Sequence, residues 1–472
     1  MKIQKNVKGL TQAHWLFVFI ALAFGAVLIY LNPPLWGADE CRHFFKTYQI
    51  SSGQLNSKKQ VVDGVEYNDG NVPASFDRLF EVFQKDVAEN LPGSKGQVEN
   101  FSKYIEAGNV NLNKDSKEPN QFGAIIYPTV TYIAPAIGMS IAGLFNPTAL
   151  SLMYAARIAA FLSYIVLVFL ALYLARNLSI KWIIFVISLL PMSLYQAATI
   201  SADPLLIGLS LVFMACVCRA IYSGKVDKRL LAVMIGSAGL LSYIKPPYVF
   251  LALPILFLPL NKNIPIITKR IIRFGIPLLC LVIAVLATLS ATHVADSSSS
   301  FASSISGQLG SIVSNPFGYL YLLINSITIC DWIPQMIGIF GTSFIYMPTP
   351  VIDLLLVLLV MVSFIKTTPL DTEEKDINHK KISGLVFVFA GLSASVVVIT
   401  VLHLACSPLG STYIWGVQGR YFLPIVGFLL IGMKMLTKVR LIVSEKSARI
   451  FIPSIIVFSL IYSMLWFYKV LY

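Results

Sequence analysis

The fold of this chain is limited most strongly by its long apolar runs, several of which approach the ~20 residues that a helix needs to cross a bilayer. Apolar residues fill 56% of the 472 positions and charged residues only 12%, and the mean hydropathy is +0.74. The interior of a soluble protein of this size is too small for that much apolar surface, whereas lipid accepts it. The sequence therefore predicts an all-α polytopic membrane protein.

The distribution of basic residues predicts the orientation of the chain. The net charge is +13, and many of the Lys and Arg residues gather in short gaps between apolar runs. This is the pattern of cytoplasmic loops rather than that of a nucleic-acid-binding protein. The first run, Trp15–Leu31, follows Lys2, Lys5 and Lys8, and no small-residue cleavage site comes after it. We therefore expect an uncleaved first span with a cytoplasmic N-terminus.

The positive-inside rule also predicts whether two ambiguous apolar segments cross the membrane. They are residues 122–145 and 315–341, and both contain prolines. If the first segment crossed the membrane, the basic loops that follow it would move to the outer side, against the rule. The same test applies to the second segment, so we expect both to remain on the outer face as interfacial or re-entrant elements. About eleven spans then remain, at residues 15–31, 148–175, 182–200, 204–222, 229–244, 247–260, 274–292, 349–365, 382–404, 421–436 and 450–468.

The expected organisation has three parts. Residues 1–32 form the cytoplasmic N-terminus and the first span. Residues 33–147 form a long extracytoplasmic loop that carries interfacial or re-entrant helices, and residues 148–472 form a transmembrane bundle. A second outer-face element interrupts this bundle at about residues 293–348.

Two adjacent carboxylates, Asp39 and Glu40, follow the first span, next to Arg42 and His43. Charges beside a bilayer are costly, which makes them functional candidates. In a helix, Asp39 and His43 would share one face. A carboxylate that His or Arg orients in a partly dry pocket can accept a proton from an attacking hydroxyl. The sequence leaves open which carboxylate is the base, and whether Asp39, Glu40 and His43 instead hold a divalent metal.

Lys245 and Arg420 both fall on predicted outer-face turns, in the sequences Lys-Pro-Pro-Tyr and Gln-Gly-Arg-Tyr. Because the positive-inside rule disfavours basic residues there, we expect them to bind a phosphate or pyrophosphate, together with Gln418 and Tyr421. The alternative is that both cations anchor their spans at the headgroup layer, assisted by the neighbouring tyrosines.

Two further charges are candidates for supporting roles. Asp203 opens a predicted span on the outer face, where it is either a site residue or a helix cap with Pro204 at the first helical position. Arg157 lies inside a predicted span, where a charge is expensive and therefore points to function.

The acid pair, the segment Tyr127–Tyr132 and Arg157 together resemble the GT-C superfamily of membrane glycosyltransferases. That superfamily includes the aminoarabinose transferases and the protein mannosyltransferases. The resemblance implies a GT-C-like fold in which the acid pair of the first outer loop supplies the catalytic carboxylate, with Tyr127 and Arg157 nearby. One departure concerns the phosphate-contacting Lys of the aminoarabinose transferases, because Ile126-Tyr127-Pro128 stands where they have Lys-Pro-Pro.

The chain resembles still more closely a large bacterial family of polytopic membrane proteins catalogued as a domain of unknown function. The shared pieces are Asp39-Glu40, His43, Tyr48, Gly53, Leu190-Pro191, Gln196, Ser201-Ala202-Asp203, Lys245 and Gln418–Pro424. This resemblance implies a multi-pass protein of the bacterial plasma membrane with a GT-C-like fold. It also implies sugar transfer from a polyprenyl-phosphate carrier to an extracytoplasmic acceptor.

Together these features predict an inverting glycosyltransferase that moves a sugar from a polyprenyl-phosphate donor to an extracytoplasmic acceptor, such as a cell-surface glycan or a lipid. Asp39 or Glu40 would be the general base, oriented by His43, and Lys245 and Arg420 would hold the donor phosphate. With two cations at the phosphate, the reaction requires no metal. A lipid-linked-glycan flippase or transporter is the alternative from another class, although no internal repeat typical of transporters is evident. A glycan polymerase is a further alternative to this glycosyltransferase.

Overall fold

The computed structural model describes most of the chain, and helices dominate it. The described residues are 12–55, 60–62, 65–67, 70–89, 101–120, 127–145, 147–224, 226–260, 264–295, 305–341, 345–368 and 377–472. The N-terminal elements are α2 (Ala13–Leu31), α3 (Glu40–Ser51), β1 (Gln60–Val62), β2 (Val65–Tyr67), β3 (Gly70–Pro73), α4 (Ala74–Glu89), α5 (Phe101–Gly108), η1 (Leu112–Lys114), β4 (Lys117–Asn120), η2 (Thr129–Tyr132) and α6 (Ile133–Ala142).

The bundle follows from α7 onward. Its first elements are α7 (Ala149–Leu174), α8 (Lys181–Ser188), α9 (Pro191–Ala197), α10 (Asp203–Ser223), α11 (Lys228–Ile244), η3 (Pro246–Phe257), α12 (Ile266–Arg270), η4 (Ile271–Gly275) and α13 (Ile276–Ala295). The later elements are α14 (Ile305–Ser314), α15 (Pro316–Ile329), α16 (Trp332–Gly338), β5 (Ile339–Phe340), β6 (Ile345–Tyr346), α17 (Thr349–Phe364), β7 (Ile365–Thr368), α18 (Ile377–Cys406), η5 (Gly419–Phe422), α19 (Leu423–Leu436), β8 (Leu441–Ser444) and α20 (Glu445–Leu471).

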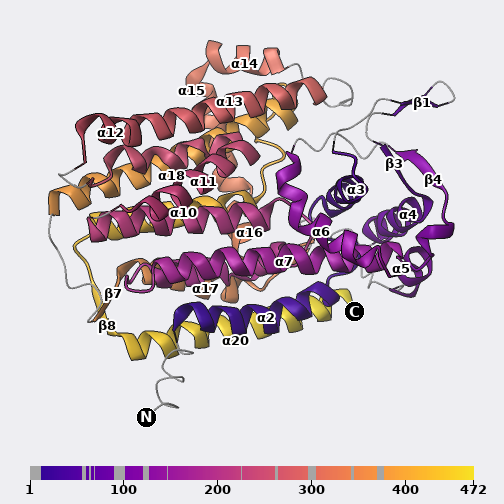
Figure 1. The fold of residues 1–472 in the computed structure, drawn as a ribbon, viewed down its shortest axis with the longest axis horizontal. Coiled ribbons are helices and arrows are strands. Elements are labelled where there is room, and N and C mark those ends of the chain that lie inside the picture. Colours follow the sequence, from indigo (N-terminus) through magenta and orange to yellow (C-terminus); the bar gives the residue numbers. More distant parts are fainter. Residues whose placement is uncertain are drawn as a thin grey trace.

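Seven helical segments of the described chain are long and apolar enough to cross a membrane, and the long helices lie side by side along the longest axis of the molecule (Figure 1). These segments are Ala13–Leu31, Ala149–Leu174, Asp203–Ser223, Ile266–Ser290, Lys381–Cys406, Gly419–Leu436 and Glu445–Leu471. The number becomes eight if α14 and α15, which meet at 107°, form one span. The chain is therefore an all-α polytopic membrane protein, as predicted.

The other four expected spans correspond to shorter or interrupted helices. They are the pair α8 and α9 with 8 and 7 residues, α11 with 17, η3 with 12 and α17 with 16. None of the four reaches the ~20 residues of a full α-helical span. The total of eleven spans therefore stays a prediction.

Prolines explain the irregular form of η3. Pro246 occupies its first position and Pro254 lies inside it. A proline donates no N–H hydrogen bond and crowds the carbonyl four residues earlier, which disfavours an α-helix. The segment is a 3₁₀-helix that packs along α18 and α13. Because a 3₁₀-helix rises ~2.0 Å per residue, this short segment covers ~24 Å.

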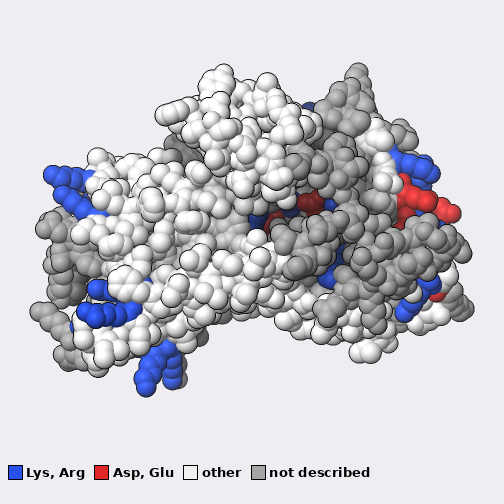
Figure 2. Space-filling model, turned by 90° about the horizontal axis from the view of Figure 1, so that it is seen from above, with Lys and Arg blue, Asp and Glu red and all other residues white. Residues whose placement is uncertain are grey.

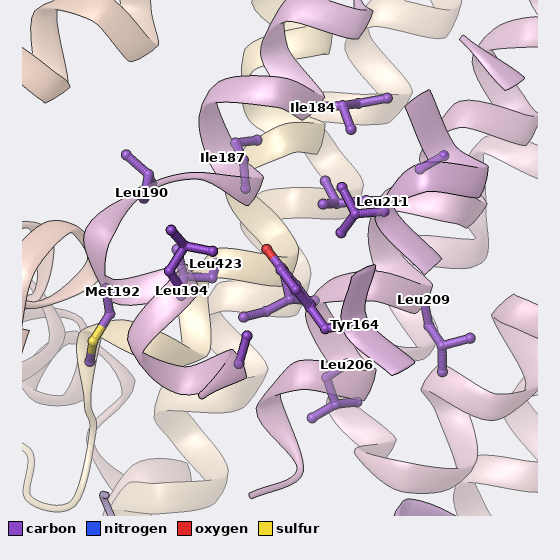
Figure 3. Close-up of a cluster of buried hydrophobic side chains, with 14 of the residues drawn as sticks. Tyr164, Ile184, Ile187, Leu190, Met192, Leu194, Leu206, Leu209, Leu211 and Leu423 are labelled. Atoms are coloured by element: carbon purple, nitrogen blue, oxygen red, sulfur yellow. The ribbon is translucent and has the colours of Figure 1, made fainter. Parts of the chain in front are cut away.

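The helices α8 and α9 are interrupted inside the bundle by a fully buried Leu-Leu pair that precedes Pro191. The Tyr164 hydroxyl donates to the Ser188 carbonyl at 2.8 Å, and the Ser193 hydroxyl donates to the Ile187 carbonyl at 2.6 Å. Figure 3 shows the Tyr164 ring among the aliphatic side chains of this turn and of α10. A break in a buried helix is tolerated because side chains satisfy the freed carbonyls.

The long first loop caps one end of the bundle with α3, α4, α5 and the antiparallel pair of β3 and β4 (Figure 1). Its two main helices pack through aromatic rings, since Phe76 on α4 stacks on Phe44 of α3 with ring centroids 4.4 Å apart. The helix α6 packs on α7 and exposes the isoleucines of its other face, Ile133, Ile137 and Ile141. This short element fits the predicted interfacial segment, of which residues 122–126 lie outside the described residues.

The second predicted outer-face element, at about residues 293–348, contains the bent pair α14 and α15, followed by α16 and the hairpin of β5 and β6. Residues 296–304 and 342–344 of this element lie outside the described part of the chain. The bend of 107° between α14 and α15 coincides with Pro316 at the first position of α15, where a proline cannot continue the preceding hydrogen-bond ladder.

Charged side chains gather at the two ends of the bundle. Among the described residues in the view of Figure 2, one end carries Lys and Arg, the opposite end carries both signs, and a wide uncharged belt separates them. The end that shows Lys and Arg in this view is the one at which the parallel strands β7 and β8 pair (Figure 1). Acidic and basic atoms also show in a recess between the belt and the other end.

Candidate active site

The turn between α2 and α3 presents Asp39 to solvent. The backbone of Asp39 is left-handed with a φ of 60°, and Leu35 earlier in the turn has a φ of 68°. Aspartate visits this conformation more readily than most residues because its short side chain can hydrogen-bond locally. The Asp39 side chain is 51% exposed, whereas that of Glu40 is wholly buried.

Both carboxylate oxygens of Glu40 accept hydrogen bonds. Arg157 of α7 donates to them at 2.7 and 2.6 Å, and the backbone amides of Gly37 and Ile200 donate at 3.0 Å each. Arg157 is itself fully buried and also donates, at 2.8 to 3.0 Å, to three carbonyls at the end of α2, those of Ile29, Asn32 and Pro33. Glu40 and Arg157 therefore fasten the turn to α7 and to the connection between α9 and α10.

Arg420 in η5 lies between two carboxylates. Its guanidinium donates to Asp39 at 2.8 Å and to Asp203 at 3.1 Å, and it also donates to the Ala38 carbonyl at 3.2 Å. Asp203 is the first residue of α10 and is only 4% exposed, and among the described residues the hydrogen bond of its carboxylate is the one from Arg420. The sequence left open whether Asp203 is a site residue or a helix cap. The structure shows its carboxylate in contact with Arg420.

The surroundings of Asp39 keep its carboxylate ionised. Partial burial raises the pKa of Asp39, but the positive charge and hydrogen bond of Arg420, together with the electrostatic effects of His43 and Arg42, outweigh it. The net pKa therefore lies below its ordinary value. Asp39 is thus an ionised and accessible carboxylate at neutral pH, which is the state in which a carboxylate can accept a proton.

His43 contacts tyrosines rather than Asp39. Its Nδ1 lies 2.8 Å from the Tyr132 hydroxyl, and its ring centroid lies 5.7 Å from those of both Tyr127 and Tyr132. Burial lowers the pKa of His43 to about 4, so the ring is neutral at physiological pH. The His43 backbone amide donates to the Asp39 carbonyl at 3.2 Å, but among the described residues no hydrogen bond joins their side chains. The structure thus differs from the prediction, because Arg420 and not His43 contacts the Asp39 carboxylate.

Lys245, between α11 and η3, has a buried ammonium group that lacks a hydrogen-bond partner among the described residues. The ammonium lies 3.5 Å from the ring centroid of Tyr421 and 5.4 Å from that of Tyr248, so two cation–π contacts stabilise it. Burial lowers the pKa of Lys245 to about 7, although the nearby carboxylates of Asp203 and Asp39 raise it. A buried cation without a hydrogen-bonding partner is costly, so an anionic ligand would stabilise it.

Two residues that the sequence predicted for the site, Arg42 and Gln418, lie outside the contacts described above. Arg42 is exposed on α3, and in the described part of the chain no hydrogen bond or ion pair involves its side chain. Gln418 is half-buried, and its carbonyl accepts from the Tyr421 amide at 3.1 Å. The sequence named Tyr132 only as the end of the segment Tyr127–Tyr132 and did not predict it as the partner of His43, because its sequence position does not distinguish it from an interfacial anchor.

The acid pair and His43 do not assemble a metal site. Within the residues that the structure describes, no three side chains of His, Cys, Asp or Glu lie close enough to hold one ion. Both oxygens of Glu40 face Arg157 and backbone amides, and His43 faces Tyr132. The geometry therefore does not support the alternative of a divalent metal held by these three residues.

The network thus joins Asp39, Asp203, Lys245 and Arg420 from four distant parts of the sequence. No curated protein and no solved structure matches the chain. A match to the family described as "Predicted membrane protein (DUF2142)" extends over residues 22–429 and includes all four residues. The chain therefore belongs to the DUF2142 family of predicted membrane proteins.

Proposed function

We propose that the protein is an inverting membrane glycosyltransferase with a GT-C-like fold. It transfers a sugar from a polyprenyl-phosphate donor to a hydroxyl group of an extracytoplasmic acceptor such as a cell-surface glycan or a lipid. The observation that carries this proposal is the proximity of the half-exposed Asp39 to Arg420 and to the unpartnered ammonium of Lys245. Such a site combines one proton acceptor with two groups suited to phosphate.

In this proposal Asp39 is the general base. Glu40 is unsuited to the role because it is buried and both its oxygens accept hydrogen bonds from Arg157 and backbone amides. The acceptor oxygen forms a bond to the anomeric carbon of the sugar while the bond from that carbon to the phosphate oxygen breaks. The hydroxyl proton moves to Asp39, and the electron pair of the broken bond leaves on the phosphate.

Arg420 couples donor binding to activation of the base. Before the donor binds, its guanidinium is shared by Asp39 and Asp203. A phosphate can accept two parallel hydrogen bonds from a guanidinium, so it competes with Asp39 for Arg420. When Arg420 turns to the phosphate, the strongest influence that lowers the pKa of Asp39 is removed. Asp39 then becomes a stronger base while Arg420 and Lys245 neutralise the charge that develops on the leaving phosphate.

We further propose that all eleven expected segments cross the bacterial plasma membrane, with the site on the extracytoplasmic face. The path of α8 and α9 supports this topology. At its start, Lys181 forms an ion pair of 2.6 Å with Glu445 of α20, and after its end the Ile200 amide donates to Glu40 beside the site. The Lys- and Arg-rich end of the bundle is then cytoplasmic, in agreement with the positive-inside rule. The polyprenyl tail of the donor lies in the bilayer.

The test is the composition of the surface glycan in a strain that lacks this protein. The strain is complemented with wild type, Asp39→Asn or Arg42→Gln, and the glycan is analysed by mass spectrometry while immunoblots measure the membrane level of each variant. We expect Asp39→Asn to reach wild-type levels and to leave the glycan lacking one sugar, with the undecorated chain still exported. Arg42→Gln, on α3 directly after the turn, is the matched control because the exposed Arg42 side chain makes no hydrogen bond or ion pair with the described residues, and we expect it to restore the wild-type glycan.

Two results would overturn this proposal. A wild-type glycan with Asp39→Asn would mean that Asp39 is not the base. Loss of the whole glycan from the cell surface, with its lipid-linked precursor retained in the membrane, would indicate a flippase or a polymerase instead.

A further inference from the structure

A second charged site lies at the opposite end of the bundle, where α2 begins, α7 ends and α20 begins (Figure 1). It is a cavity of about 150 Å³. Its lining includes Gln12, His14, Arg176, Asn177, Lys181 and Arg449. A water molecule takes ~30 Å³ in the liquid, so the cavity is large enough for a phosphate group.

Three cations and one carboxylate surround this cavity. The Lys181 side chain is only 3% exposed and pairs with Glu445 at 2.6 Å, and Arg449 donates to the same carboxylate at 3.0 Å. Arg176 has no carboxylate partner in the described part of the chain, and its guanidinium lies 4.1 Å from the ring centroid of Tyr173. Because Glu445 offsets one of the three positive charges, the cavity retains two.

One wall of the cavity carries an unsatisfied polar atom. The Nδ1 of His14 is buried and has no hydrogen-bond partner among the described residues. Its ring packs edge-on against those of Phe169 and Tyr173, at centroid distances of 5.1 and 5.8 Å. A polar ligand in the cavity would supply the missing partner, as buried polar groups normally require one.

The helices that carry these cations expose apolar side chains beside the cavity. Trp15 on α2 and Tyr173 on α7 are 38% and 44% exposed, and aromatic residues of these two kinds concentrate at the headgroup level of membranes. Ile450 and Phe451 on α20 directly follow the cavity residue Arg449 and are 61% and 51% exposed. A ligand with both a phosphate and acyl chains matches these features, because its phosphate would lie in the basic cavity and its chains along the neighbouring apolar surface.

We propose that this cavity binds the phosphate of an anionic phospholipid, whose acyl chains lie along the outer faces of α2 and α20. Basic pockets between membrane helices are suited to anionic headgroups. A zwitterionic lipid would instead bring its own cation next to a cavity that already holds two net positive charges. The bound lipid would hold α2, α7 and α20 together at this end of the bundle, independently of the proposed glycosyl transfer.

The test uses quenching of Trp15 by brominated lipid in vesicles that contain the purified full-length protein. All vesicles contain phosphatidylcholine and phosphatidylglycerol in the same ratio, and only one of the two lipids carries bromine, so the surface charge stays constant. Subtraction of the signal of Trp15→Phe isolates Trp15. We expect brominated phosphatidylglycerol to quench Trp15 more strongly than brominated phosphatidylcholine. Arg176→Gln and Arg449→Gln should each lower this preference about fivefold, the factor for one basic residue at an anionic surface.

The matched control is Lys446→Gln, which removes an exposed cation from α20 that does not line the cavity and should leave the preference unchanged. Thermal unfolding of each variant checks that it is folded. Equal quenching by the two lipids in the wild type overturns the proposal. An equal effect of Lys446→Gln and Arg449→Gln on the quenching preference also overturns it, because it would indicate a general attraction of anionic lipid to the basic surface. Loss of the preference on addition of inorganic phosphate would show that the cavity takes a free anion instead.

Discussion

Arg157 and Glu40, which are 117 positions apart in the sequence, form a fully buried ion pair with two hydrogen bonds of 2.7 and 2.6 Å. This pair separates the roles of two adjacent carboxylates. Because Arg157 and two amides use both oxygens of Glu40, only Asp39 retains an accessible carboxylate. The same pair fixes the left-handed turn that presents Asp39.

The Arg157→Met variant tests the structural role of this pair. The substitution leaves the Glu40 carboxylate buried without its charged partner, and breaking a buried pair on one side typically costs about 3–5 kcal/mol. We expect a large fall in the midpoint of thermal unfolding of the purified protein. The double variant Arg157→Met/Glu40→Met removes both charges and should recover much of the loss. A single variant as stable as the wild type would contradict this role of the pair.

The Lys245→Met variant should be more stable than the wild type at neutral and lower pH. It replaces an ammonium without a described hydrogen-bond partner by a side chain of similar length that suits an apolar environment. Burial lowers the pKa of Lys245 from 10.5 to about 7, so between these values the folded protein binds fewer protons at this site than the unfolded chain. The stability of the wild type therefore rises with pH across this window, and the advantage of the variant shrinks.

Unfolding midpoints of both proteins at a series of pH values from about 6 upward measure this difference. A difference that is constant across the series would mean that Lys245 has an ordinary pKa. Because the variant also loses a phosphate-binding cation, its donor affinity should fall even though its stability rises, and this opposite change separates a binding role from a packing role.

Donor binding should weaken with rising pH in the wild type. Only the protonated form of Lys245 attracts a phosphate, and burial lowers the pKa of this group to about 7. Affinity for the polyprenyl-phosphate donor should therefore fall as the pH rises above that value. Lys245→Arg keeps its charge throughout this range, because an arginine side chain does not lose its proton there. A variant with the same pH dependence as the wild type would show that another group titrates.

Gly419→Ala should displace Arg420. A Cβ atom at this position would lie 2.2 Å from the Trp332 carbonyl oxygen and 2.4 Å from the Met336 amide nitrogen. Both are backbone atoms, so η5 has to move and Arg420 moves with it. We expect loss of glycosyl transfer and a lower unfolding midpoint. The control is Gly310→Ala on α14, where no described atom outside the surrounding helix backbone and the adjacent residues lies within 4 Å of the new Cβ. Equal glycosyl transfer and equal unfolding midpoints in the two variants would argue against a tightly packed η5.

The sequence alone predicted the long apolar helices and the charged residues that the structure brings together, because lipid penalises polar groups strongly. Apolar runs longer than ~17 residues have few alternatives to crossing a bilayer. For the same reason, every charge next to such a run is conspicuous. This reasoning predicted Asp39, Asp203, Lys245 and Arg420, which lie in one network. It overlooked the form of η3 and the break between α8 and α9, which depend on prolines and on hydroxyl partners from other helices.

Only the tertiary structure decided which of these residues contact one another. Asp39 and Glu40 are neighbours in the sequence, yet Asp39 has a left-handed backbone in the turn and Glu40 is the first residue of α3, so their side chains face different parts of the molecule. Arg157, 117 positions from Glu40, and Arg420, 381 positions from Asp39, determine what each carboxylate can do. His43 likewise bonds to Tyr132, 89 positions away. Local sequence patterns encode secondary structure and membrane insertion, whereas these pairs depend on how distant helices pack.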